Sequence, residues 1–341
     1  MKSGVKMSVI KRRETELDIL RFFSMLSVIA MHVCGGIMKE LPSKSFDFIV
    51  MNSLITIITW CIPIFVMISG GLFLNPKREI TVKKLFTKYI KRFAVAFLFW
   101  TIIYQIYYYV SARVNGGETL NWKGIICEAI TGPYHMWYLY MLTGIYITIP
   151  VLRKITESKA ITEYFIIVFL IFSFIQNYGV NLPIGATYLG YFILGFYIKN
   201  YDISRKIEYA LYALTVLLLI ANCSIFAVYV LKDIDGIWSV KYLMPNIVIE
   251  SAGIYTFFVK RVSKINFSER TVKIFSKLTE YGFGVYLVHA LVNEFVGLTG
   301  WTAVTVSPFV SVPLLTIVIY GVSLAVTVAI RKIPFIGKNI T

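Results

Sequence analysis

The first apolar segment of this 341-residue chain carries an acid, an arginine and a histidine that could perform chemistry inside a membrane. Arg21 and His32 are eleven residues apart, which is three helical turns plus about 20°, so both project from one helix face. Asp18 lies one turn before Arg21 on that face. A charge within a bilayer is costly unless it is paired or faces a polar cavity. We therefore expect this face to point inward, with Asp18 paired to Arg21 and His32 free to act as a base or nucleophile.

A structural interpretation of the same residues is also open. Asp18 and Arg21 could mark the interfacial end of a helix, and His32 could be a hydrogen-bonded core residue. The segment alone does not decide between the two interpretations, so the rest of the chain must.

The elements that would position these residues are transmembrane helices. Hydrophobic residues make up 57% of the chain, the mean hydropathy is +0.72, and apolar runs of about 20 residues recur, which is typical of a polytopic membrane protein. The first run lacks a small-residue cleavage site, so we expect it to be retained as a helix. We predict an all-α bundle with ten spans at 17–37, 47–74, 89–110, 136–152, 160–178, 184–199, 207–231, 240–259, 279–297 and 308–330.

The net charge of +16 is explained by membrane topology and needs no nucleic-acid partner. If alternate loops are cytoplasmic, these loops hold 27 of the 34 Lys and Arg residues and the outer loops hold 6, with Arg21 inside the membrane. This asymmetry follows the positive-inside rule. It predicts that both termini are cytoplasmic, with a basic segment at 1–16 and a short tail at 331–341. We expect 1–341 to be a single membrane domain.

The sequence contains no recognisable metal-binding pattern. Its four cysteines have no CxxC spacing, and its three histidines are far apart and belong to no HExxH motif. We predict no metal, although a site assembled from distant residues stays open. Glu250 is an isolated acid within the eighth predicted span, so we expect it to be protonated or paired with another helix.

Five phrases resemble the acyltransferase-3 family of integral-membrane enzymes. The first is ELDILR followed, after ten residues, by His32. The others are PIFVMISGGLFL (63–74), in which Pro63 should bend the second span, HMWYLYMLTGIYITIPVL (135–152), YFILGFYI (191–198) and GVYLVH (284–289). Together they extend over most of the chain.

The resemblance implies an O-acyltransferase that moves an acyl group, expected to be acetyl, from cytoplasmic acetyl-CoA or another acyl-CoA. The implied acceptor is a hydroxyl of a bacterial surface polysaccharide or its lipid-linked precursor. The protein would be a multi-pass protein of the bacterial inner membrane, surrounded by lipid. Acyl-CoA would be a donor substrate, and no bound cofactor is expected.

The resemblance also suggests the site. Asp18, Arg21, His32, His135 and His289 are the expected catalytic residues. Trp137, Tyr138 and Tyr286 are expected to bind substrate, although His135 and its aromatic neighbours could simply form an interfacial belt. Within the basic run at 77–92, Lys88 and Arg92 would bind donor phosphates, or the run could face anionic lipids.

The predicted topology places all three histidines in the outer half of the membrane. The basic donor-binding candidates lie on the inner side. We therefore expect a histidine-lined chamber, reached by the donor's pantetheine arm from the cytoplasm and by the acceptor from outside.

Two other functions fit the hydropathy. A transporter or flippase of glycan intermediates would also need ten spans and intramembrane charges, although no inverted repeat is visible. A ligand-sensing membrane domain that lost its chemistry is the third possibility, and the presence of both Arg21 and His32 argues against it.

Reporter fusions test the predicted topology. Fusions after Asn75 and Lys154 should give a cytoplasmic signal, and a fusion at Gly116 should give an external one, because of the unequal distribution of Lys and Arg. A cytoplasmic signal at Gly116 would contradict the ten-span topology.

Overall fold

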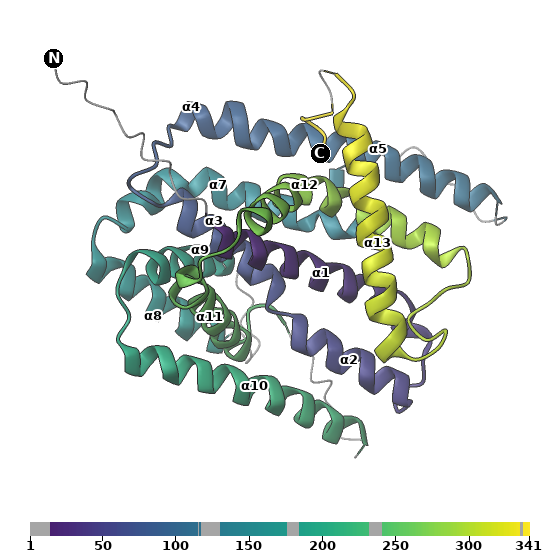
Figure 1. Cartoon of the computed structure of the whole chain (residues 1–341), viewed down its shortest axis with the longest axis horizontal. Coiled ribbons are helices and arrows are strands. Elements are labelled where there is room, and N and C mark those ends of the chain that lie inside the picture. The colour runs from purple at the N-terminus through teal and green to yellow at the C-terminus, as the bar shows by residue number, and fades with distance from the viewer. Residues whose placement is uncertain (1–13, 115, 117–129, 176–183, 232–240, 335–336) are drawn as a thin grey trace.

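The computed structural model describes residues 14–114, 116, 130–175, 184–231, 241–334 and 337–341, and these residues form an all-α bundle without β-strands (Figure 1). Its helices are α1 (Thr15–Ile37), α2 (Phe46–Ile58), α3 (Cys61–Phe73), α4 (Val82–Lys84), α5 (Lys91–Val114), α7 (Trp137–Ile155), α8 (Lys159–Ile175), α9 (Ile184–Asn200), α10 (Arg205–Leu231), α11 (Pro245–Lys260), α12 (Glu269–Gly297) and α13 (Pro308–Arg331). Short turns of other helix types are η1 (Met38–Glu40), η2 (Leu85–Ile90), η3 (Tyr134–Met136) and η5 (Val262–Lys264).

Five helical segments of the described chain are long and apolar enough to cross a membrane. They are Thr15–Glu40, Phe46–Phe73, Val82–Val114, Arg205–Ile225 and Pro308–Arg331. The other predicted spans also coincide with helices, but the ten-span count and the cytoplasmic termini stay predictions. Most of the predicted basic segment at 1–16 lies outside the described residues.

Helix α1, which carries Asp18, Arg21 and His32, runs through the middle of the bundle. It packs against α2, α3, α12 and α13 (Figure 1). Leu17, Leu20 and Ile29 of α1 are completely or almost completely buried. A central helix of this kind can hold polar groups away from lipid along its inward face.

The second predicted span consists of two helices. The break between them comes a few residues before Pro63, where we expected a bend. α2 ends at Ile58 and α3 begins at Cys61, so Pro63 falls in the first turn of α3. The backbone N–H groups of a first helical turn have no intrahelical partner, so proline costs little there. Ile64 N–H then bonds to Trp60 C=O, 3.1 Å away, and the new helix continues.

Helices α3 and α9 approach closely because each presents a glycine to the other. A Cβ added at Gly195 would overlap the backbone of Met67, and one added at Gly70 would overlap the backbone of Phe192. Small residues at helix interfaces permit this kind of contact in membranes.

Glu250 was expected to be either protonated or paired with another helix, and it has a partner on another helix. It is completely buried on α11, and the Asn222 side-chain amide on α10 donates to its Oε1 over 2.6 Å. Hydrogen bonding between helices lowers the cost of placing such a polar group in the membrane interior.

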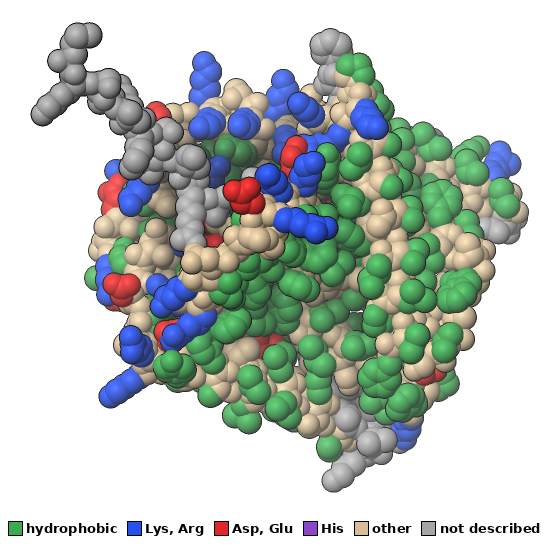
Figure 2. Space-filling view, viewed as in Figure 1, with side chains coloured by type: hydrophobic (Ala, Val, Ile, Leu, Met, Phe, Trp, Pro, Cys, Tyr) green, Lys and Arg blue, Asp and Glu red, His purple; other side chains and the backbone are tan. Residues whose placement is uncertain are grey.

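Basic and hydrophobic side chains occupy different parts of the surface. Lys and Arg are concentrated toward the end of the bundle where α1, α10 and α12 begin, and hydrophobic side chains dominate the remainder of the view (Figure 2). Outward-facing hydrophobic residues on the long helices include Ile102, Ile106, Leu217, Ile220 and Ile317. This distribution is that of helices surrounded by lipid, with one basic end.

The close packing of α3 against α9 can be tested by substitution. Gly195→Ala should destabilise the protein by about 1–3 kcal/mol, because its methyl group forces two backbones apart. Gly144→Ala is the matched control, since a Cβ there meets no atom within 4 Å. The midpoint of thermal unfolding in detergent should fall for Gly195→Ala alone, and equal midpoints for the two variants would contradict this account of the packing.

Candidate active site

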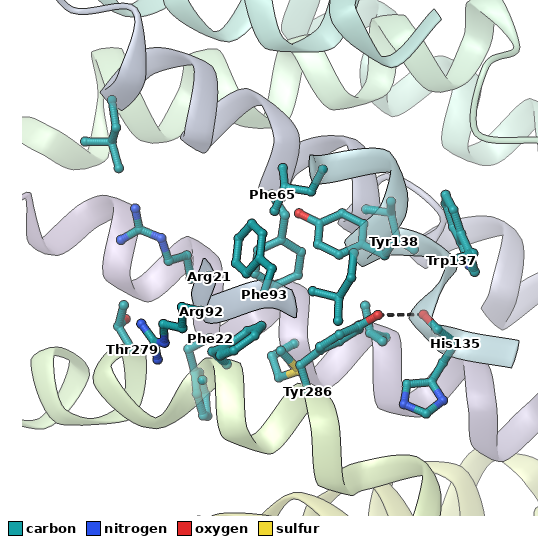
Figure 3. Close-up of a pocket in the computed structure, with 18 of the residues that line it drawn as sticks. Arg21, Phe22, Phe65, Arg92, Phe93, His135, Trp137, Tyr138, Thr279 and Tyr286 are labelled. Carbon is teal, nitrogen blue, oxygen red and sulfur yellow. Dashed lines mark hydrogen bonds between the residues drawn. The ribbon is translucent and has the colours of Figure 1, made fainter. Parts of the chain in front are cut away.

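One cavity of about 380 Å³ lies beside α1 and is lined by residues of α1, α3, α5, α7 and α12. Arginines lie at one end of it and histidine with aromatic residues at the other (Figure 3). Arg21 and His32 both line this cavity, so the face predicted to point into the protein does so. Because eleven residues of helix separate them, the cavity extends about 16 Å along α1.

Among the described residues, three guanidinium groups line the cavity and no Asp or Glu does. Arg21 Nη1 forms the expected ion pair with the buried Asp18, at 2.8 Å. The guanidinium carbons of Arg78 and Arg92 lie 5.2 Å and 4.9 Å from the ring centres of Phe73 and Phe283, respectively. Of the three, Arg21 is the one that pairs with a described Asp or Glu, and a group of guanidinium side chains of this kind favours an anion.

Arg92 is further fixed by the chain's last described residues. Its Nη2 donates to Thr341 C=O over 2.6 Å, and on the same helix Trp100 Nε1 donates to Ile340 C=O over 2.7 Å. These bonds hold the beginning of α5 against the segment 337–341 and limit the positions that the guanidinium can take.

Lys88 does not line the cavity, unlike Arg92. Its side chain is exposed on η2, with Nζ 5.7 Å from the ring centre of Tyr89, which does line the cavity. Lys88 therefore lies at the margin of the arginine-lined end.

The three histidines of the chain come together at the other end. The ring centres of His32 and His289 are 5.1 Å apart, those of His135 and His289 are 5.4 Å apart, and those of His32 and His135 are 6.4 Å apart. They come from α1, η3 and α12. His32 and His135 line the cavity, whereas His289 is completely buried next to them.

Hydrogen bonds to Tyr286 tie two of the histidines to one turn of α12. Tyr286 Oη donates to His135 C=O over 2.5 Å, the bond drawn in Figure 3. The Tyr286 C=O lies 2.6 Å from His289 Nδ1. Both nitrogens of the His135 ring and Nε2 of His289 are buried without a hydrogen-bond partner among the described residues.

Aromatic rings separate the two ends. Phe22, Phe65, Phe93 and Tyr138 lie between the arginines and the Tyr286–His135 pair (Figure 3). A passage lined in this way suits an uncharged chain and keeps ions from crossing.

Trp137 and Tyr138, the remaining predicted substrate-binding residues, also line the cavity. The ring of Trp137 stacks on that of Tyr242, with centres 5.9 Å apart and an angle of 29° between the ring planes. Tyr242 lies just before α11, about a hundred residues further along the chain.

Sequence reasoning missed Arg78 and Tyr242 as lining residues. Arg78 belongs to the basic run at 77–92, and no local pattern distinguishes it from the neighbours of Lys88 and Arg92 in that run. Tyr242 belongs to no recognised phrase. Only the packing of distant segments brings either residue to the cavity.

The described His, Cys, Asp and Glu side chains form no group of three or more arranged to hold a metal ion. The three imidazoles nevertheless lie close to one another, with ring centres 5.1, 5.4 and 6.4 Å apart. Both ring nitrogens of His135 and Nε2 of His289 have no partner among the described residues, and an imidazole nitrogen can accept or donate a proton.

Comparison with known proteins identifies one family. The family model Acyl_transf_3, described as an acyltransferase domain, matches residues 14–332. No curated protein and no solved structure matches the chain.

Proposed function

This chain belongs to the acyltransferase-3 family, and we propose that it transfers an acyl group, acetyl in the first instance, from cytoplasmic acyl-CoA to a hydroxyl of a cell-surface polysaccharide or its lipid-linked precursor. The protein is a membrane acyltransferase. The finer assignment to the bacterial inner membrane follows from the family resemblance and belongs to the proposal, whereas the unequal distribution of basic residues supports only the orientation of the helices.

The observation that carries the proposal is a single cavity with arginines at one end and histidines at the other. A CoA thioester needs both: positive charge for its phosphates, and a base or nucleophile at its acyl carbon. The pantetheine arm between these groups is uncharged, which suits the aromatic middle of the cavity. Arg21, Arg78 and Arg92 would bind the phosphates, and the thioester would reach His32.

His32 is the proposed base, because it lines the cavity at the end away from the arginines. It would take the proton of the acceptor hydroxyl as the hydroxyl oxygen forms a bond to the acyl carbon. The carbon–sulfur bond would then break, and the CoA thiolate would take up a proton. Alternatively, His32 could first carry the acyl group itself and pass it to the hydroxyl in a second step.

The acceptor would approach from the opposite side of the membrane, past Trp137 and Tyr242. Stacked aromatic rings offer flat apolar faces together with polar edges, which suits a sugar ring with its mixed surface. The acyl group would then cross the membrane while CoA remains on the cytoplasmic side.

Sealed vesicles of known orientation test this arrangement. Radiolabelled acetyl-CoA should be consumed only when supplied at the cytoplasmic face. The label should appear on polysaccharide, isolated from cells lacking the protein, only when that polysaccharide is supplied at the other face. Labelled product formed with both substrates at the cytoplasmic face would overturn transfer across the membrane, and a transporter would give no labelled product in any arrangement.

The arginines predict a second result, in the kinetics of the donor. Arg78→Gln and Arg92→Gln should each raise the KM for acyl-CoA about tenfold or more, because a charge-assisted hydrogen bond is worth about 1.5–3 kcal/mol. Loss of uniform binding should leave kcat nearly unchanged. Lys88→Gln should have a smaller effect, because its side chain lies outside the cavity.

Lys83→Gln is the matched control for these variants, since Lys83 is exposed in the same basic run and does not line the cavity. The KM values are to be compared in purified protein whose elution in gel filtration matches that of wild type. A KM that rises as much for Lys83→Gln as for Arg92→Gln would show that the run acts as a diffuse charge rather than through the cavity.

A further inference from the structure

The turn of α12 that carries His289 is held by a tyrosine from another helix. Tyr104 of α5 donates its hydroxyl hydrogen to Leu287 C=O over 3.0 Å and accepts from Leu291 N–H over 2.9 Å. In a regular α-helix these are the two groups that bond to each other, because N–H(i) pairs with C=O(i−4). The Tyr104 hydroxyl therefore lies between the two partners of one backbone hydrogen bond of α12. The turn that this bond would close contains His289.

Insertion of a side chain into the helical hydrogen-bond ladder is one of the few causes of local distortion in a helix. Tyr104 is completely buried. Its ring centre also lies 5.1 Å from that of His135. One side chain thus contacts both α12 and η3, the two elements that bring His289 and His135 to His32.

The surroundings of His289 fix the position of its proton. A backbone carbonyl can only accept a hydrogen bond, so the contact of 2.6 Å with Tyr286 C=O requires that Nδ1 carry the hydrogen. In the neutral ring, Nε2 is then the acceptor. This nitrogen is buried and has no partner among the described residues. The closer of the two neighbouring imidazoles is that of His32.

We propose that Tyr104 is a positioning residue for acyl transfer, which holds the turn from Leu287 to Leu291 so that His289 keeps its Nδ1–H on Tyr286 and offers Nε2 to His32. His289 would then accept a hydrogen bond or a proton from His32 and orient it. This is the role that a third group plays behind the base in other proton-transfer sites. The inference rests on the proposed function, because it assumes that His32 acts on the substrate.

The variant Tyr104→Phe removes only the bridging hydroxyl. The ring still fills its buried site, and Leu291 N–H and Leu287 C=O can then bond directly to each other, so the fold should persist. The turn should shift, and with it His289. Removing an outer group that orients a metal ligand typically costs about 10- to 100-fold in activity, and we expect a base oriented through hydrogen bonds to respond similarly. We expect kcat to fall by about this factor, with KM for acetyl-CoA changed by less than about twofold.

Tyr109→Phe is the matched control, because Tyr109 is on the same helix and is 45% exposed. It loses the same atom without contact to α12 in the described structure, and its kcat should equal that of wild type. Both variants should retain the wild-type gel-filtration profile. A wild-type kcat in Tyr104→Phe would overturn the proposal.

A direct measurement of the tautomer separates positioning from general stability. Since the chain has three histidines, ¹⁵N labelling of histidine gives few ring signals, which His289→Gln assigns. His289 should carry its hydrogen on Nδ1 in wild type and in Tyr109→Phe, and should show a mixture of tautomers in Tyr104→Phe. An unchanged tautomer together with a reduced kcat would assign Tyr104 a merely structural role and overturn the inference.

His32→Ala distinguishes the failure of this inference from the failure of the proposed function. If folded His32→Ala transfers acetyl groups at the wild-type rate, the proposed role of His32 fails, and the positioning role fails with it. If His32→Ala is inactive and Tyr104→Phe is fully active, the positioning role alone is wrong.

Discussion

The cost of placing charged and polar groups in hydrocarbon is the constraint on which the rest of this structure depends. Each such group must be paired, hydrogen-bonded or turned toward an internal cavity. The bundle meets this requirement by placing α1 in the middle and directing Arg21 and His32 into one cavity. Glu250, which does not face that cavity, is paired with Asn222 instead.

The same constraint shapes how the arginines are held. Arg21 is paired with Asp18, whereas Arg78 and Arg92 lie over aromatic rings. Rings attract cations without supplying a full negative charge, so the site keeps net positive charge for an incoming anion. In the proposed function this charge would serve the phosphates of acyl-CoA, and an acid lining the cavity would weaken their binding.

Sequence reasoning succeeded where a pattern is local to one helix and failed where distant segments meet. The spacing of Asp18, Arg21 and His32 predicted their shared face, because helical periodicity is independent of tertiary contacts. The predicted topology put the three histidines at similar depth, and the structure brings their rings together. The sequence could not show that Arg92 lines the cavity and Lys88 does not, because this depends on how η2 packs on α7 and how α5 packs on α12. Tyr104 was not identified at all, since the groups that it bridges are more than 180 residues away.

The arginine end of the cavity holds charged side chains, whereas the histidine end favours neutral ones. The ring centres of the three imidazoles lie 5.1 to 6.4 Å apart. Three positive charges at these distances would repel one another strongly, so neutral rings with defined tautomers are favoured. A neutral ring has one donor and one acceptor nitrogen, and an acid–base site works only if each faces the correct partner. Backbone carbonyls are suitable anchors because they accept and never donate, and Tyr286 C=O fixes His289 in this way. In the proposed mechanism, the unpartnered nitrogens of His135 and His289 are the ones left available for proton transfer.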